Sequence, residues 1–177
     1  LAGFTIQLGI GQGDLLVTPL QMAVAYAAIA NGGTVVTPSV ARRVQDPNGR
    51  VLQELAAGRP TRRVELRPEN LSAIREGLYL ASNGVDGTAT AVFGNLPEGK
   101  QVAGKTGTAE QKTGPDTRDH SWFVGYAPHD DPEIVVAVVI ERGGTGASAS
   151  APAVCTTIGA YIDYSPDLCG VPVEETN

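Results

Sequence analysis

Apolar residues occupy almost every position between residues 19 and 30. Thr18 precedes this run, Pro19 stands at its first position, and Gln21 follows the threonine by three residues. A threonine cap, a proline in the first turn and a glutamine three residues after the cap are typical of a helix start. Asn31 and Gly32 end the run. The pattern predicts a helix over residues 19–30, and its apolar character on nearly every face predicts a central, fully covered helix.

Two short β-like runs, residues 39–45 and 50–55, flank the sequence Asp-Pro-Asn-Gly at positions 46–49. Proline and Asn-Gly favour tight turns, so the pattern predicts a β-hairpin. Before the first helix, the glycine-rich stretch 9–14 is expected to form a loop.

Residues 68–82 have the spacing of a second helix, which Asn83-Gly84 would end. The apolar positions that set this spacing are Leu71, Ile74 and Leu78. A short turn or helix is expected to follow over residues 88–93.

The last third of the chain has a different pattern. Residues 102–110, 121–127 and 134–142 are strand-like, and positions 134–140 are continuously apolar, as in a strand covered on both faces. A final helix is expected over residues 151–162. Helices followed by consecutive strands and a helix predict an α+β fold with an antiparallel sheet packed by helices, in one domain or most of one.

Composition and charge exclude several classes. The 177 residues carry a net charge of −6, and the arginine pairs at 42–43 and 62–63 are read as solvated charges, so no nucleic-acid partner is expected. No apolar run reaches the roughly 20 residues of a membrane span. No cluster of His, Cys or Asp suggests a metal, and no cofactor is expected. Because the chain opens without an initiator Met or a leader, we expect a fragment that starts within a domain.

The two cysteines, Cys155 and Cys169, lie 14 residues apart. They are too few for a structural zinc site. Either they form a disulfide in an oxidising compartment, or Cys155 is buried on the last helix and Cys169 is free.

Lys105-Thr106-Gly107-Thr108 is the strongest candidate for chemistry. On a strand, Thr106 and Thr108 point to the same side, and Gly107 between them lets another backbone approach closely. A lysine ammonium and two hydroxyls can hold a carboxylate, while the main-chain N–H of an edge residue can stabilise an oxyanion. The segment therefore suits a carboxylate-bearing acyl donor laid along the strand.

The other candidates are weaker. His120 is read as a loop or strand-start histidine, with a place on the rim of the cleft as a second possibility. His129, in a polar turn, is read as solvent-facing. Trp122 and Tyr126 are expected to pack on the sheet. The glycine-rich residues 143–146 are read as the loop between the last strand and the last helix, with a role in substrate access as a second possibility.

Five segments together resemble the class B penicillin-binding proteins, the membrane-anchored transpeptidases that cross-link bacterial peptidoglycan. The segments are residues 9–13, 18–23, 27–33, 102–109 and 121–128, in the order and approximate spacing of that family. The first two are most similar to its elongation-type branch. The resemblance covers most of the chain and implies the penicillin-binding, serine β-lactamase-like fold.

The resemblance also implies roles. In that family a serine of a Ser-x-x-Lys motif attacks the D-Ala-D-Ala amide of a stem peptide, or a β-lactam, and a Ser-x-Asn motif assists proton transfer. Lys105 would supply positive charge near the serine, Thr106 and Thr108 would bind the substrate carboxylate, and the N–H of Thr108 would form half of the oxyanion hole. Gly107 would permit close approach.

The chain departs from the family in one respect. None of its three lysines has serine three residues before it, and none of its asparagines has serine two residues before it. We therefore expect residues 1–177 to be the C-terminal part of the transpeptidase domain, inactive without its N-terminal part. The implied partners are peptidoglycan stem peptides, β-lactams and a glycan-polymerising membrane protein, at the outer face of the cytoplasmic membrane. A non-catalytic sensor domain and a D,D-carboxypeptidase or β-lactamase remain the alternatives.

Overall fold

A computed structural model describes residues 2–13, 15–55, 60–110 and 118–170. Its helices are α1 (Ala2–Gly9), α2 (Pro19–Ala30), α3 (Pro68–Asn83), α4 (Thr90–Phe93) and α5 (Ala151–Ile162), with a turn of π-helix, η1 (Gly146–Ser150), and of 3-10 helix, η2 (Pro166–Leu168). Its strands are β1 (Thr34–Val36), β2 (Arg43–Gln45), β3 (Val51–Glu54), β4 (Pro60–Arg63), β5 (Ala103–Ala109), β6 (His120–Ala127) and β7 (Ile134–Ile140). The expected α+β class is confirmed.

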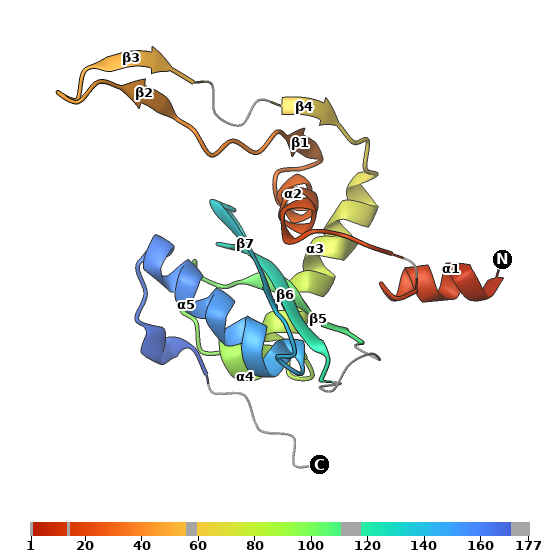
Figure 1. Ribbon diagram of the computed structural model, residues 1–177. Helices are drawn as coiled ribbons and strands as arrows, with labels where there is room; N and C mark the ends of the chain where they lie inside the picture. The colour runs from red at the N-terminus through yellow and green to blue at the C-terminus, as the bar shows by residue number, and fades with distance from the viewer. Residues whose placement is uncertain (1, 14, 56–59, 111–117, 171–177) are drawn as a thin grey trace.

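The central sheet is antiparallel and has the order β5-β6-β7, so β5 lies at an edge. Helix α5 covers one face, and α2 and α3 lie on the other side (Figure 1). The continuous apolar run of β7 is thus covered by helices on both faces as expected, although each of its residues is only partly buried.

Each face of the sheet has its own core. On the α5 side, the Phe93 and Phe123 rings lie 4.9 Å apart and pack with Val154 and Ile158. On the α2 side, buried Tyr126 packs with Ala30 of α2 and Ala103 of the edge strand β5. The predicted role of Tyr126 in sheet packing is confirmed, and neighbouring Trp122 is half-buried.

Helix α2 begins as predicted. The main-chain N–H of Gln21 donates to Thr18 Oγ1 at 3.2 Å, and that of Thr18 donates to Gln21 Oε1 at 2.8 Å, which completes the capping box. The prediction of a fully covered helix is wrong, because Leu20 is 59% exposed and only Ala28 and Ala30 are buried. The helix packs against the sheet, β1 and α3, and the described residues do not cover its remaining surface.

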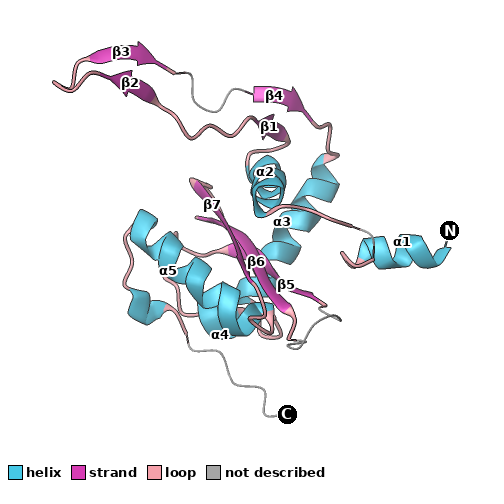
Figure 2. Ribbon diagram, in the orientation of Figure 1, coloured by secondary structure: helices cyan, strands magenta, loops and turns pink. Residues whose placement is uncertain are grey.

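The predicted hairpin is present as β2 and β3. Its turn is closed by the carboxylate of Asp46, which accepts from the main-chain N–H groups of Asn48 and Arg50. A second ribbon, β1 paired with β4, carries this hairpin away from the sheet (Figure 2). The sequence pattern did not predict this second ribbon or α1. It did predict the loop after Gly9 and the bounds of α5.

A disulfide joins Cys155 on α5 to Cys169 beyond η2, so the alternative of a free Cys169 is wrong. The Tyr164 hydroxyl donates to the Cys155 carbonyl at 2.7 Å, and the N–H of Gly170 donates to the Val92 carbonyl of α4. The segment that follows α5 is therefore fixed across α4 and α5.

Among the described residues, no helix combines the length and the hydropathy that a membrane span requires. The same part of the chain holds no group of three or more His, Cys, Asp or Glu residues placed to bind a metal ion.

Candidate active site

Four alternate carbonyls of the edge strand face away from the sheet, and each accepts a hydrogen bond from a side chain. The bonds run from Asn83 Nδ2 to Val102 O (2.8 Å), Ser82 Oγ to Gly104 O (3.3 Å), Lys105 Nζ to Thr106 O (3.1 Å) and Gln12 Nε2 to Thr108 O (3.1 Å). The N–H and C=O of one strand residue point the same way. The N–H groups of Thr106 and Thr108 therefore face the same outer edge.

The two halves of this edge differ. Ser82 is fully buried and ties the end of α3 to the first half of β5, so that half is covered. Lys105 and Thr108 are exposed, and Thr106 is half-buried. The accessible part of the edge thus coincides with the four residues that the sequence singled out, residues 105–108.

A cluster of one ammonium and two hydroxyls lies at this edge. Lys105 Nζ donates to Thr106 Oγ1 at 2.8 Å and lies 3.4 Å from Thr88 Oγ1, and the two hydroxyl oxygens are 3.0 Å apart. Partial burial lowers the pKa of Lys105 from its ordinary value. The cluster offers positive charge and hydroxyl donors in a small volume, which suits an anionic group.

Strand register decides which way these side chains leave β5. Thr106 pairs with Phe123, and Thr108 pairs with Ser121, so both threonines lie on the α5 face, as their alternation predicts. Lys105 pairs with Val124 on the opposite face. Its hydrogen bond to Thr106 Oγ1 therefore requires the lysine side chain to reach around the outer edge of the strand.

Gly107 lies under η1. A Cβ placed on Gly146 would lie 2.3 Å from Trp122 O, 2.7 Å from Gly107 O and 2.8 Å from Gly107 N. This contact depends on Gly146, because a Cβ on Gly107 would instead lie 3.1 Å from the Cβ of Trp122 on the opposite face. The approach of another backbone at Gly107, which the sequence predicted, stays a prediction. Gly146 belongs to η1, so the expected loop over residues 143–146 is shorter than predicted by one residue.

Both ends of η1 are fixed to β6 by buried hydroxyls. Ser121 Oγ donates to Thr145 O at 2.8 Å, and Ser150 Oγ donates to Ser121 O at 2.9 Å. Ser121 and Ser150 are both fully buried. These bonds hold the turn before α5 in place beside the strand that carries Lys105.

The two histidines lie at opposite ends of β6: His120 pairs with Ala109, next to Thr108, and His129 follows the other end. His120 Nδ1 accepts from the Arg142 main-chain N–H at 3.0 Å, which is a structural role as predicted. The prediction that His129 faces solvent is wrong, because its side chain is only 22% exposed and its ring lies 4.6 Å from that of Tyr79. The main-chain N–H of His129 donates to the Gln101 carbonyl at 2.8 Å, and this bond ties the turn to the segment that leads into β5.

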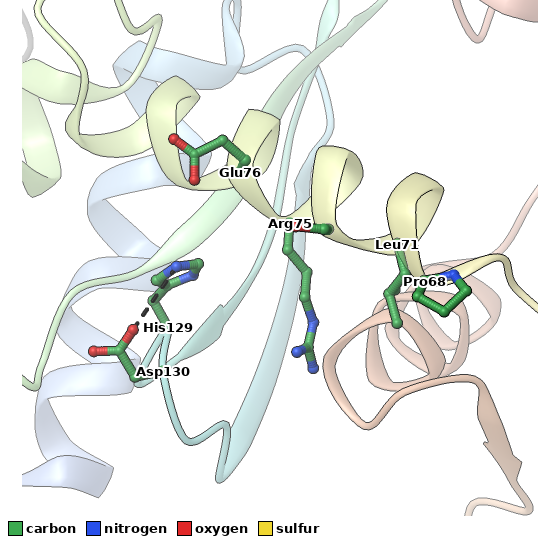
Figure 3. A pocket seen from close by; sticks show the side chains of 7 residues that line it. Pro68, Leu71, Arg75, Glu76, His129 and Asp130 are labelled. Carbon is green, nitrogen blue, oxygen red and sulfur yellow. Dashed lines mark ion pairs between the residues drawn. The ribbon is translucent and has the colours of Figure 1, made fainter.

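His129 lines a cavity of about 350 Å³ between α3 and the β6–β7 turn (Figure 3). The remaining lining residues are Pro68, Leu71, Ser72, Arg75, Glu76 and Asp130. Arg75 extends from α3 to the end of α2, where Nε donates to Ile29 O at 3.1 Å and Nη2 donates to Ala30 O. This cavity lies at the end of the sheet opposite Thr108, so it is separate from the lysine cluster.

Thr88 and Gln12 are the residues that sequence reasoning missed. Gln12 lay inside a recognised segment but had no assigned role, and its partner is 96 positions away. Thr88 comes from the loop between α3 and α4 and is brought to β5 by the anchoring of α3. A long-range contact of this kind leaves no periodic signal in a single sequence.

The family model described as "Penicillin binding protein transpeptidase domain" matches residues 1–158. The chain is 32% identical over 191 residues to the peptidoglycan D,D-transpeptidase MrdA of Haemophilus influenzae, with 98% of this chain and 28% of MrdA covered. It is 34% identical over 151 residues to the peptidoglycan D,D-transpeptidase PbpA of Mycolicibacterium smegmatis, with 85% of this chain and 29% of PbpA covered.

Two solved structures are similar over most of the chain. Penicillin-binding protein A from M. tuberculosis, as its ceftriaxone acyl-enzyme complex, has a TM-score of 0.73 at 31% identity over 87% of this chain and 34% of that chain. Pseudomonas aeruginosa PBP2 in complex with WCK 5153 has a TM-score of 0.72 at 31% identity over 99% of this chain and 36% of that chain. Both are penicillin-binding proteins, as the sequence resemblance implied.

The chain spans less than a third of the length of the two curated relatives. The family match nevertheless covers residues 1–158 and includes the strand that carries Lys105. This chain therefore belongs to the transpeptidase-domain family of the class B penicillin-binding proteins, in the PBP2-type group that includes the MrdA and PbpA enzymes.

Proposed function

We propose that residues 1–177 are the C-terminal part of the transpeptidase domain of a peptidoglycan D,D-transpeptidase and supply its substrate-binding strand. The observation that supports this most is the outer edge of β5, where the main-chain N–H groups of Thr106 and Thr108 face outward beside the Lys105 ammonium, while their carbonyls accept from Lys105 and Gln12. A stem peptide would add to this edge as a further strand. An added strand is aligned by main-chain hydrogen bonds, which suits a peptide substrate.

Each residue of the strand has a proposed role. Lys105 supplies positive charge near the reacting serine, and the hydroxyls of Thr106 and Thr108 bind the substrate carboxylate. The outward N–H of Thr108 forms half of the oxyanion hole, where it stabilises the charge that develops on the attacked carbonyl. Gly107 permits the close approach of the substrate to the strand.

The reaction proceeds through an acyl-serine. A serine outside this chain attacks the D-Ala-D-Ala amide carbonyl, and the amide nitrogen takes a proton and leaves as D-alanine. The amine of a second stem peptide then attacks the ester, which releases the serine and forms the cross-link. A β-lactam acylates the same serine when its ring opens. Because the chain contains no Ser-x-x-Lys motif, it does not carry the nucleophile itself.

The proposed partners follow from this activity. The N-terminal part of the same protein supplies the serine, and a glycan-polymerising membrane protein of the elongation complex supplies the strands to be joined. The site acts at the outer face of the bacterial cytoplasmic membrane, to which a segment outside this chain anchors it.

Labelling with a fluorescent penicillin tests the proposal. In the complete protein, Lys105→Ala is expected to lose most of its label, whereas Lys100→Ala is the matched control, because Lys100 donates to the Asp163 carbonyl at the end of α5. Residues 1–177 alone are expected to take no label. Full labelling of Lys105→Ala would contradict the assignment of Lys105, and a covalent label on the isolated chain would contradict the missing nucleophile.

A second measurement separates the transpeptidase from its alternatives. The complete protein is given a D-Ala-D-Ala stem peptide together with an acceptor amine, and the products are separated by mass. A cross-linked product supports the transpeptidase. Hydrolysed peptide alone would indicate a carboxypeptidase, rapid turnover of the β-lactam would indicate a β-lactamase, and binding without acylation would indicate a sensor.

A further inference from the structure

Thr88 is held at the outer edge of β5 by a tightly packed turn. The preceding residue, Gly87, has no room for a side chain, because its Cβ would lie 2.4 Å from Leu80 O. The following residue, Ala89, is 1% exposed and donates its N–H to the Ala81 carbonyl at 3.0 Å. The main chain on both sides of Thr88 is therefore fixed against the end of α3.

The end of α3 is in turn fixed to β5. Ser82 and Asn83 donate to main-chain carbonyls of Gly104 and Val102, immediately before the lysine. These two bonds set the distance between the turn and the strand. They leave the Thr88 hydroxyl 3.0 Å from the Thr106 hydroxyl, although the two residues are 18 positions apart in the sequence.

The contact between Thr88 and Thr106 leaves one hydroxyl hydrogen available to a ligand. An ammonium has three donors, and Lys105 Nζ lies within reach of three oxygens: Thr106 O, Thr106 Oγ1 and Thr88 Oγ1. Each hydroxyl has one donor, and only one of the two hydrogens is used between Thr88 and Thr106. The other hydroxyl hydrogen is available to an outside acceptor, and both hydroxyls lie beside the positive charge.

When Thr88 is the donor, the Thr106 oxygen accepts from both Lys105 and Thr88. Both of its lone pairs are then used, so Thr106 can act toward a ligand only as a donor. A carboxylate accepts hydrogen bonds and carries the opposite charge, so it matches this arrangement. The lowered pKa of Lys105 is consistent with an ammonium that has exchanged water for a few fixed oxygens.

We propose that Thr88 is a positioning residue for the carboxylate site. It acts by holding the Thr106 hydroxyl and the Lys105 ammonium toward the substrate. This inference rests on the proposed function, since the carboxylate is that of the stem peptide or β-lactam. It adds to the site formed by residues 105–108 a residue from the loop between α3 and α4.

Acylation kinetics of the complete protein test the proposal. Benzylpenicillin, which carries the carboxylate, is compared with its uncharged methyl ester. Thr88→Val is expected to lower the acylation rate constant for benzylpenicillin about tenfold and to leave that for the ester unchanged, because the ester has no carboxylate to be positioned. Thr88→Ser keeps the hydroxyl and is expected to restore the rate. Thr156→Val, at an exposed threonine whose hydroxyl donates to Pro152 O on α5, is the matched control.

An equal loss for both compounds in Thr88→Val would overturn the proposal, because it would indicate only a disturbed fold. An unchanged benzylpenicillin rate would overturn it as well. A second measurement does not depend on acylation: NMR titration of Lys105, assigned with Lys105→Arg. Loss of an acceptor is expected to lower the pKa of Lys105 further in Thr88→Val and not in Thr156→Val. An unmoved pKa would overturn the role of Thr88, whereas failure of the wild type to be acylated would overturn the proposed function alone.

Discussion

Gln12 Nε2 donates a hydrogen bond of 3.1 Å to the main-chain carbonyl of Thr108, which joins the glycine-rich loop after α1 to the end of the edge strand. The two residues belong to different segments of the family resemblance. Their contact gives the loop a structural role, because it covers an outward carbonyl of β5 that has no strand beside it in the described part of the chain. Unpaired edge carbonyls otherwise invite pairing with another chain.

Gln12→Leu removes this donor and keeps a side chain of similar size. The free energy of unfolding is expected to fall by about 1 kcal/mol, the usual worth of one intramolecular hydrogen bond. Urea unfolding of the purified protein measures the change. Gln53→Leu on the exposed strand β3 is the control, and its change is expected to be close to zero. Equal changes in the two variants would show that the bond from Gln12 contributes nothing.

Gly146→Ala and Gly77→Ala make the same chemical change, but the first is expected to lower the free energy of unfolding and the second to raise it. At Gly146 the new Cβ would lie 2.3 Å from Trp122 O, so β6 and η1 must separate, at a cost of about 1–3 kcal/mol. At Gly77, inside α3, no atom lies within 4 Å of the new Cβ, and alanine should stabilise the helix by about 0.5–1 kcal/mol. Thermal unfolding measures both, and a destabilised Gly77→Ala would contradict the reasoning.

Features that depend on residues close together in the sequence could be predicted from it, whereas features that depend on contacts between distant residues could not. Local rules placed α2 from its capping box, the hairpin turn from Asp46 to Gly49, and α5 at its observed bounds. Alternation placed Thr106 and Thr108 on one face, which the register confirms. These predictions needed only neighbouring residues.

Predictions that depend on distant contacts were wrong or were not made. His129 was expected in solvent because its neighbours are polar, but Tyr79 of α3 covers its ring. Helix α2 was expected to be covered on all faces, but apolar composition does not say which surfaces meet. The approach of Thr88 to Thr106 depends on how α3 is fixed to β5, which no local pattern encodes.

Removal of the disulfide is expected to loosen the segment after α5. The bond closes a loop of 14 residues, for which chain entropy predicts a contribution of about 3 kcal/mol. The double variant Cys155→Ser with Cys169→Ser should therefore unfold at a lower temperature than the oxidised wild type. Reduction of the wild type with dithiothreitol should bring it to the same temperature, and no shift on reduction would mean that the bond does not stabilise the fold.

Tyr126→Phe is expected to leave the protein equally stable or more stable. The Tyr126 hydroxyl is buried and has no hydrogen-bond partner among the described residues. Burial raises its pKa above the ordinary value, and nearby Arg75 offsets only part of this effect. Removal of a buried, unpartnered hydroxyl removes its desolvation cost of about 1–3 kcal/mol. Tyr164→Phe is the control, since that hydroxyl donates to Cys155 O at 2.7 Å and its loss should destabilise. Chemical denaturation ranks the two variants, and the reverse ranking would contradict the prediction.

Titration of Lys105 should contribute to the way the free energy of unfolding changes with pH. Burial lowers its pKa below the ordinary value of 10.5, so the folded protein gives up this proton at a lower pH than the unfolded chain does. Between the two pKa values the unfolded chain binds more protons, and the free energy of unfolding therefore rises with pH in that interval. The unfavourable term is fully present below the folded pKa and is lost as the pH approaches 10.5.

Lys105→Met and Lys105→Arg both remove this titration, the first because it has no charge and the second because arginine stays protonated. Relative to either variant, the wild type should gain stability as the pH rises from neutrality toward 10.5. Urea unfolding across that range measures the difference. A difference that stays constant with pH would mean that the folded protein does not perturb the Lys105 ammonium, and a wild type that loses stability relative to both variants would mean that it holds the proton more tightly than the unfolded chain.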